Sequence, residues 1–387
     1  MTGDRTRAAL VTPAFLTVVL VGLVYWVGFN MVIPELPPFV TRELGGSSLA
    51  VGLIVGAPAL TAVFTRPVAG RLGNRFGRKV LMIGGAATAG GAIAAYGLTS
   101  SEVALAALRL ATGVGQGLFF TGAATLVSDI APPARRGEAM SYFSIAAYMG
   151  TGLGPLTGQL LAEQIGLHAV FGVAGLFCVA GALLSLRAPN VRIVAGAGLS
   201  RPGLFNRKGV GPGLVMMFGL MGYTAFQAYA PLYTVRQLHL SGPAVAFLLY
   251  AGIILVCRLA FARLFDRVGA RRCASTATLT IAAGLVVIAA WPTVTGLYVG
   301  VAVFSLGMAV QYPALFTMAV NRANERDRAP VIGTFTAFLD LATGLGGVTL
   351  GAVAALAGYR ASFVGGAVAA LLGFAVLQRL FASPATS

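Results

Sequence analysis

Long apolar runs, separated by short polar segments, extend over almost the whole chain. Each run holds about twenty residues or more, the length that an α-helix needs to cross the hydrocarbon core of a bilayer. The runs lack the two-residue alternation of a transmembrane barrel, so the pattern predicts spanning helices and excludes a barrel. With ends uncertain by a few residues, we expect twelve helices, at roughly 10–33, 48–68, 80–99, 103–127, 139–161, 167–187, 210–232, 243–263, 273–291, 294–318, 331–355 and 360–381.

A more polar stretch divides the predicted helices into two sets of six. We therefore expect an all-α integral membrane protein with a six-helix bundle in residues 1–187, a cytoplasmic linker at 188–209 and a second six-helix bundle in residues 210–387. The first apolar run follows Arg5 and Arg7, as in a signal peptide. It is too long for a signal peptide and lacks a small-residue cleavage pattern, so an uncleaved first helix is expected.

Composition agrees, because 57% of the 387 residues are hydrophobic and only 10% are charged, whereas soluble proteins are about a quarter charged. In a soluble protein the net charge of +16 would suggest nucleic-acid binding. Here most lysines and arginines fall in every second polar segment, beginning with the N-terminus, which is the positive-inside pattern. We expect both termini in the cytoplasm, a cell inner membrane location and no nucleic-acid partner. The exceptions are Arg42, Arg236 and Arg360 in outer segments and Arg66, Arg109 and Arg258 within spans.

The two halves carry an internal repeat. The stretch RPVAGRLGNRFGRK from Arg66 and the stretch RLAFARLFDRVGAR from Arg258 lie 192 residues apart and align arginine with arginine at three positions. The same offset relates TGLGP from Thr151 to TGLGG from Thr343. The repeat predicts the same topology in both halves, as in transporters built from parallel repeats, which bind a small molecule between the halves near the bilayer midplane.

Three motifs carry a family resemblance over nearly the full length. GRLGNRFGRK at 70–79 resembles the signature between helices 2 and 3 of the major facilitator superfamily, and LRLATGVGQG resembles its RxxxGxG motif in helix 4. GTGLGPLTGQ resembles the GxxxGPxxGG motif in helix 5 of the superfamily's antiporters, through Gly150, Gly154, Pro155 and Gly158. These glycines share one helix face and permit close approach of a neighbouring helix. The resemblance implies a twelve-helix transporter of the branch that exchanges drugs or metabolites for protons.

The resemblance also implies a cytoplasmic gate, in which cations of the signature pair with acids at neighbouring helix ends. Asp129 and Glu138 are the expected local partners. Asn74 stands where the signature has an acid, whereas the second copy keeps Asp266. The ionic contacts that close the gate are therefore expected to be weaker in the first half than in the second. In the alternative interpretation the cations only set the topology. The gating candidates are Gly70, Arg71, Asn74, Arg75, Gly77, Arg78, Asp129, Glu138, Asp266 and Arg267.

Asp340 is the exception among 11 acidic residues, most of which lie in predicted loops. It is about ten residues into its helix, on the order of 15 Å from the helix start and close to the midplane. An ionised aspartate at that depth costs roughly 2.5–3.5 kcal/mol, so Asp340 should face the cavity, bind a proton, or both. These properties suit a proton carrier, and the alternative is a structural cap for neighbouring polar groups.

Arg109 is the complementary cation, in helix 4. The resemblance implies that the arginine of this motif faces the cavity and takes part in proton transfer. Its partner is left open between Glu35, Asn30 and Asp340. Asn30 lies in a region of helix 1 where several related exporters carry an acid, which argues against a two-acid mechanism. Arg66 and Arg258 lie nearer the cytoplasmic helix ends and are expected to extend their charges toward the headgroups.

The substrate cavity is expected to be lined by aromatic and amide side chains, each of which could instead form an interhelical hydrogen bond. So few charges favour an uncharged, weakly polar or cationic amphiphile over a polyanion. The cavity candidates are Tyr25, Asn30, Gln116, Tyr148, Tyr223, Gln227, Gln311 and Tyr312.

Two functions remain open on this sequence: proton-coupled export of small amphiphilic molecules such as drugs or metabolites, and proton-coupled or facilitated uptake of a nutrient such as a sugar. The helix-5 motif favours export, and Asp340 favours proton coupling. The three cysteines form no CxxC pair and the two histidines lie far apart, so no disulfide, metal site or other cofactor is expected. The expected partners are a small molecule, protons and the lipid bilayer, and the chain is expected to be a monomer and not an enzyme.

Overall fold

The computed structural model describes residues 10–132, 135–191, 206–322 and 328–381, and their side chains except at 137, 261–267, 328–330 and 381. In that part of the chain every long element is an α-helix, and there are twelve of them, which confirms the predicted all-α fold. They are α1 Pro13–Met31, α3 Ser48–Phe76, α4 Arg78–Ala94, α5 Glu102–Ile130, α6 Arg136–Ile165, α7 Leu167–Ser185, α8 Arg207–Arg236, α9 Ala244–Val268, α10 Ala270–Ala290, α11 Val294–Asn321, α12 Arg328–Ala357 and α13 Tyr359–Phe381. Three short helical turns accompany them: α2 Leu36–Pro38, a π-helical turn Phe39–Glu43 and a 3-10 turn Tyr96–Leu98.

Ten of the described helices are long and apolar enough to cross a membrane. The remaining two long helices, α6 and α9, also coincide with predicted spans. Helix α6 mixes its apolar residues with serine, threonine and glutamine, and the described side chains of α9 up to Ala260 form an apolar stretch, Ala244–Ala260. The chain is therefore a multi-pass membrane protein.

The signature segment differs from the expected loop. Helix α3 continues to Phe76 and α4 begins at Arg78, so the turn between the two helices is the single residue Gly77. The predicted spans ended at 68 and resumed at 80. The polar residues between these limits lie beyond the apolar run, yet arginine and lysine are good helix formers and extend both helices.

The turn glycines repeat in the backbone as well as in the sequence. Gly77 has a φ of +98° and Gly269, 192 residues later, has a φ of +87°. Gly166 and Gly358 are related by the same offset and have φ values of +84° and +83°. These left-handed conformations favour glycine, and each of the four residues directly precedes a helix. The internal repeat therefore extends to the geometry of the turns.

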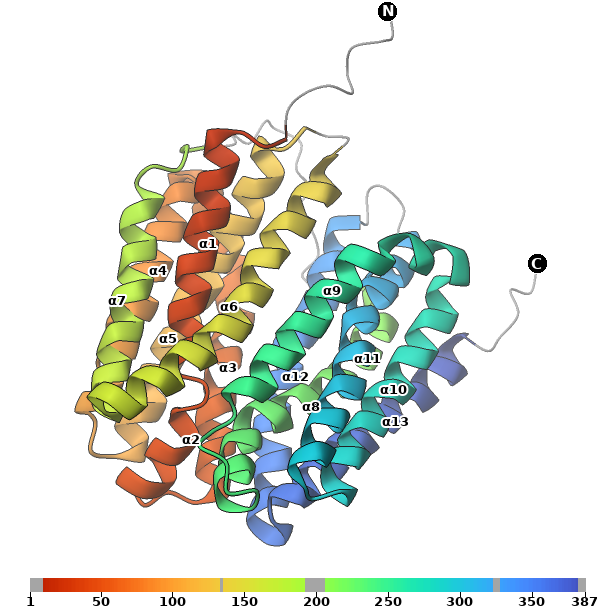
Figure 1. Ribbon diagram of the computed structural model, residues 1–387. Coiled ribbons are helices and arrows are strands. Elements are labelled where there is room, and N and C mark those ends of the chain that lie inside the picture. Colours follow the sequence, from red (N-terminus) through yellow and green to blue (C-terminus); the bar gives the residue numbers. More distant parts are fainter. Residues whose placement is uncertain (1–9, 133–134, 192–205, 323–327, 382–387) are drawn as a thin grey trace, which may run out of the picture. The chain divides into compact units, whose positions relative to one another are not determined.

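The described residues form two compact units, each considered by itself. The first comprises Met1–Val32, Thr61–Thr99 and Val103–Gly198. In it α1 packs against α6 and α7, and α4 packs against α7 (Figure 1). Glycines occur where helices approach most closely. A Cβ on Gly85 of α4 would meet the carbonyl oxygen of Gly115 of α5, the small-residue packing typical of helices in lipid.

The second unit comprises Ile33–Leu60, Ser100–Glu102 and Leu199–Ser387. In it α8 packs against α12 and α13, and α10 packs against α11 and α13 (Figure 1). Residues 33–60 precede the polar linker in sequence but pack in this unit, so α3 is divided between the two units. The sequence boundary at 188–209 stays a prediction.

Candidate functional site

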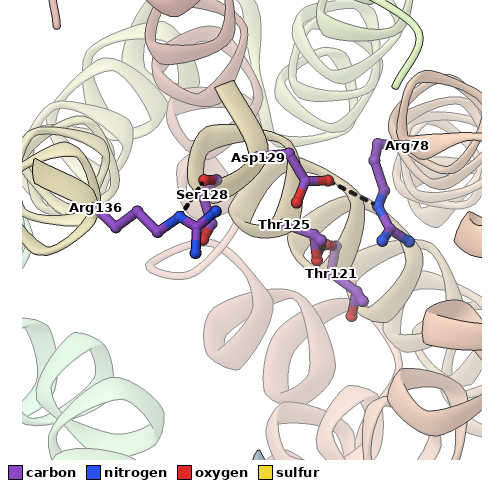
Figure 2. A network of polar contacts seen from close by, with 6 residues as sticks. All are labelled: Arg78, Thr121, Thr125, Ser128, Asp129 and Arg136. Atoms are coloured by element: carbon purple, nitrogen blue, oxygen red, sulfur yellow. Dashed lines mark hydrogen bonds and ion pairs between the residues drawn. The ribbon is translucent and has the colours of Figure 1, made fainter. Parts of the chain in front are cut away.

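The signature segment contains a buried ion pair at the start of α4 (Figure 2). The Nε of Arg78 lies 3.2 Å from Oδ2 of Asp129, and the two side chains are 6% and 16% exposed. Water screens such a pair weakly. Asp129 lies one residue before the end of α5, and Arg136 donates from Nε to the carbonyl oxygen of Ser128 beside it. Of the two acids expected to pair with cations of the signature, Asp129 does so, with Arg78.

Glu138 pairs with Arg135, and its expected pairing with the signature stays a prediction. Arg135 donates from Nε and from an Nη to the two carboxylate oxygens of Glu138, both at 2.8 Å. The two residues are three apart in sequence, within one helical turn, so their side chains are neighbours on the helix surface. The hydrogen bond from Arg135 lowers the pKa of Glu138 and raises the pKa of Arg135.

The signature segment also binds the chain that follows α7, an arrangement that no motif predicted. The backbone N–H of Arg78 donates to the carbonyl oxygen of Val191 at 3.2 Å, and the Nζ of Lys79 donates to the carbonyl oxygen of Leu186. A Cβ on Gly77 would overlap the side chain of Asn190. The signature thus holds the first residues that lead into the predicted linker.

The remaining gating candidates lie at the surface or outside the described side chains. Arg71, Asn74 and Arg75 are exposed, and the Cβ position of Gly70 has nothing described within 4 Å. The side chains of Asp266 and Arg267 lie outside the described part of the chain. The expected difference in strength between the gate contacts of the two halves therefore stays a prediction.

The helix-5 motif packs directly against α1. Cβ atoms on Gly150, Gly154 and Gly158 of α6 would meet backbone atoms of Trp26, Val27 and Met31 respectively. Because the glycines are four residues apart, they form one strip along α6, and Pro155 lies inside the helix between them. The close packing expected of the motif is present.

Asp340 lies near the middle of α12, the thirteenth of its 30 residues. The side chain is 7% exposed. Gly344 and Gly347 follow it at four and seven residues and so share its helix face. Both glycines pack against α3, Gly344 at Leu60 and Gly347 at Gly52, within the second unit. Asp340 therefore lies one turn away from a close helix crossing.

Arg109 is fully enclosed in the first unit, with only 2% exposed. Its Nη1 donates to the hydroxyl of Tyr96 at 3.5 Å, and its guanidinium carbon lies 5.9 Å from the centroid of the same ring. The Tyr96 hydroxyl also shares a hydrogen bond with Thr112. Tyr96, on the turn after α4, is a partner that the sequence analysis missed.

The candidate partners of Arg109 lie in different places. Asn30, 6% exposed, donates from Nδ2 to the carbonyl oxygen of Trp26 at 2.8 Å, within its own helix. Glu35 and Asp340 belong to the second unit. A direct pairing of Arg109 with any of the three stays a prediction.

The aromatic cavity candidates fall into two environments. Tyr25 is 0% exposed and stacks on Phe119, with 3.7 Å between ring centroids, so it belongs to the packed interior of the first unit. Tyr223 accepts a hydrogen bond from Gln227 at 3.0 Å and stacks on Tyr250 at 4.9 Å. Tyr250 joins this polar and aromatic group although the sequence analysis did not name it.

The remaining cavity candidates, two glutamines and two tyrosines, also differ in their surroundings. Gln311 is 0% exposed, and its amide lies directly on Gly219 of α8, where a Cβ would overlap it. Tyr312 stacks on Phe316, with centroids 5.8 Å apart. Gln116 and Tyr148 are partly exposed in the first unit. The eight predicted cavity residues are thus divided between the two units, and their common role stays a prediction.

Comparison with known proteins gives a full-length match. A family model described as Major Facilitator Superfamily matches residues 18–272 and 213–387. An uncharacterized MFS-type transporter of Burkholderia pseudomallei (strain 1106a) is 27% identical over 385 residues, which cover 97% of this chain and 94% of the relative. An uncharacterized MFS-type transporter of Salmonella typhimurium (strain LT2) is 27% identical over 368 residues, which cover 89% and 90%.

Solved structures share the fold at low sequence identity. The human organic anion transporter MFSD10 (TETRAN) has a TM-score of 0.72 at 21% identity, over 95% of this chain and 100% of that one. The nucleoside transporter NupG has a TM-score of 0.76 at 12% identity, over 96% and 100%.

Proposed function

This chain belongs to the Major Facilitator Superfamily, and from that premise we propose that it exports small amphiphilic or weakly polar molecules in exchange for protons. As a member of the superfamily it is a secondary transporter in a membrane and not an enzyme. The proposal adds the coupling ion, the direction and the substrate type. It further places the chain in the cell inner membrane as a monomer with both termini in the cytoplasm, and it assigns the transport cycle to alternating access between the two halves.

The observation that carries the proton coupling is the position of Asp340. Asp340 is 7% exposed in the middle of a long apolar helix, where the charged form of a carboxyl group is costly and the protonated form is not. A group of this kind changes its protonation when the surrounding helices admit or exclude water. One charge that crosses a potential of about 100 mV carries roughly 2.3 kcal/mol, enough to drive a substrate against a concentration gradient.

The direction of transport is supported by the helix-5 motif. Its glycine strip is packed against the backbone of α1, as the resemblance to antiporters requires. The substrate type is supported by the cavity candidates, which are mainly aromatic and amide side chains. The two solved relatives named above are described as transporters of organic anions and of nucleosides, both small organic molecules.

Uptake of a nutrient by symport is the second candidate, because Asp340 would serve it equally well. The two functions differ in the direction of the proton. In proteoliposomes loaded with a pH-sensitive dye and given no initial gradient, an external substrate of a symporter acidifies the interior. The external substrate of an antiporter makes the interior more alkaline.

The test uses purified full-length protein in such proteoliposomes and a panel of anionic, neutral and cationic amphiphiles. We expect at least one compound to make the interior alkaline in the wild type and to have no effect in Asp340→Asn. Glu163→Gln is the matched control, because this exposed acid lies at the end of α6 and its change should leave the response intact. Acidification by the active compounds would favour uptake, and an undiminished response in Asp340→Asn would remove the carboxyl group from the coupling mechanism.

A further inference from the structure

Two arginines inside the apolar helices lie over aromatic rings in an arrangement that the internal repeat relates. The guanidinium carbon of Arg66 on α3 lies 4.9 Å from the ring centroid of Phe120 on α5. The guanidinium carbon of Arg258 on α9 lies 6.0 Å from the ring centroid of Tyr312 on α11. The arginines are 192 residues apart and so are the rings. Each unit therefore carries the same cation–aromatic pair at the same place in the repeat.

Both arginines lie inside one end of an expected membrane span. Arg66 lies two residues before the end of the expected span 48–68 and Arg258 lies five residues before the end of the expected span 243–263, about 3 Å and about 8 Å along the helix at 1.5 Å per residue. The Nε atoms of both are buried. Charged side chains within membrane spans are costly and rare, and such residues mark substrate and ion pathways. Each guanidinium lies over an aromatic ring, and the expected extension of these charges toward the headgroups stays a prediction.

Arg109, the third arginine within a span, is a different kind of residue. It is 2% exposed, bound to Tyr96, and its repeat-related position is Val301. Arg66 and Arg258 are only partly buried and occur in both units. The three arginines are thus of two kinds. Arg109 is enclosed and has no repeat-related arginine, whereas Arg66 and Arg258 are related by the repeat and partly exposed.

The charge within the spans indicates what these two positions attract. The predicted spans hold at least three arginines and only one acid, Asp340, so positive charge exceeds negative charge within the spans. A guanidinium can stack on a ring through its planar face and bind a carboxylate or phosphate through its N–H groups at the same time. An aromatic ring beside the cation offers an apolar surface for the rest of the ligand.

We propose that Arg66 with Phe120 and Arg258 with Tyr312 are two repeat-related positions for an amphiphilic anion, whose charged group binds the guanidinium and whose apolar body lies on the ring. This inference rests on the proposed transport function and deepens it by naming the substrate class. It replaces the expectation of an uncharged or cationic amphiphile, which counted the charges but not their placement. The same chemistry is offered by a soluble organic anion and by the headgroup of an anionic lipid.

The test measures binding by purified full-length protein in phosphatidylcholine nanodiscs. The probes are three ligands of matched size: 4-phenylbutyrate, its uncharged amide and 4-phenylbutylamine. We expect the carboxylate to bind at least about ten-fold more tightly than the other two, the range of a hydrogen bond to a charged group. Equal binding of the three probes, tighter binding of the amine, or no measurable binding of the carboxylate overturns the proposal.

The variants Arg66→Gln and Arg258→Gln should each lose tight carboxylate binding at their own position and so lower the number of carboxylates bound per protein, and the double variant should lose the preference for the carboxylate. Arg66→Lys should keep part of the binding, because lysine keeps the charge but lacks the planar fork. Arg42→Gln is the matched control, since it removes one exposed cation outside the spans. Thermal unfolding without ligand identifies any variant that fails to fold, and for such a variant Phe120→Leu or Tyr312→Leu takes its place. Unchanged carboxylate binding in folded Arg66 and Arg258 variants contradicts the proposal.

A second set of nanodiscs containing phosphatidylglycerol identifies the source of the anion. If lipid headgroups occupy the positions, carboxylate affinity falls in the wild type and stays constant in the double glutamine variant. If soluble anions are the ligands, phosphatidylglycerol leaves the affinity unchanged. The binding assay is independent of proton movement, so failure of the Asp340 experiment and failure of this inference can be told apart.

Discussion

Gly52 of α3 and Gly347 of α12 lie so close that a Cβ atom on either would overlap the carbonyl oxygen of the other. The hydroxyl of Tyr229 reinforces this crossing and donates to the carbonyl oxygen of Ser48 at 2.9 Å, at the start of α3. Nearby, Arg236 donates to the hydroxyl of Thr41 at 3.0 Å. Residues 33–60 are thus held in the second unit by close backbone contact and by the hydrogen bonds from Tyr229 and Arg236.

Gly52→Leu should detach residues 48–60 from α12, because an added side chain in so tight a contact typically costs about 1–3 kcal/mol. The measurement is maleimide labelling of Ser48→Cys, since the three native cysteines are buried. We expect labelling to become faster and transport to fall in the Gly52→Leu background. Gly91→Ala is the control, because its Cβ position on α4 has nothing described within 4 Å. Identical labelling rates in the two backgrounds would show that the crossing does not hold this segment.

The pair of Arg78 and Asp129 predicts a loss of stability when one partner is removed. Asp129→Asn leaves the guanidinium of Arg78, which is 6% exposed, without its counter-charge, and breaking a buried pair in this way costs about 3 kcal/mol or more. The measurement is the free energy of unfolding in mild detergent. Glu138→Gln, at an exposed ion pair, should reduce the free energy of unfolding far less. Equal stability of Asp129→Asn and the wild type would show that the pair does not stabilise the protein in detergent.

The helices could be predicted from the sequence because the bilayer sets their length. The expected span 167–187 is Leu167–Ser185 in the structure, and the expected span 294–318 is the apolar part of Val294–Asn321. The error at 70–79 has a physical cause. Hydropathy marks where the apolar zone ends, whereas a helix ends where the backbone must turn, and here that residue is Gly77.

The site could be predicted only in part. Asp340 was identifiable because a lone acid in a long apolar run is rare. Tyr96, the partner of Arg109, was not, because its contact depends on how the turn after α4 packs on α5 and leaves no periodic signal. The rings beneath Arg66 and Arg258 were within reach, since Phe120 and Tyr312 obey the same offset as the arginines. A search for repeat-related pairs, rather than single repeat-related residues, would have found them.

The hydrogen bond between Arg135 and Glu138 predicts a shift in titration. It lowers the pKa of Glu138, so the folded state holds this proton less tightly than the unfolded state does. The contribution of the pair to stability is therefore present above the ordinary pKa of glutamate and is lost as the pH falls through the lowered value. Arg135→Gln should raise the pKa of Glu138 toward its ordinary value, which carboxyl 13C chemical shifts of labelled glutamate can follow. An unchanged pKa would show that the pair is open in solution.

The repeat supplies a matched experiment on the signature turn. Gly77 and Gly269 have similar positive-φ backbones, with φ and ψ of +98° and 157° and of +87° and 137°, and an alanine at either position costs about 1–3 kcal/mol from strain alone. Their surroundings differ, because a Cβ on Gly77 overlaps Asn190, whereas nothing described lies within 4 Å of the Cβ position of Gly269.

Gly77→Ala should therefore reduce the free energy of unfolding by more than Gly269→Ala does. The difference between the two losses measures how tightly Asn190, in the chain that follows α7, packs against the signature. Adding Asn190→Ala to Gly77→Ala should remove much of that difference, because it takes away the side chain that the new methyl group meets. If the two single variants are equally destabilised, the contact with Asn190 contributes nothing, and the signature acts on the linker only through the hydrogen bonds from Arg78 and Lys79.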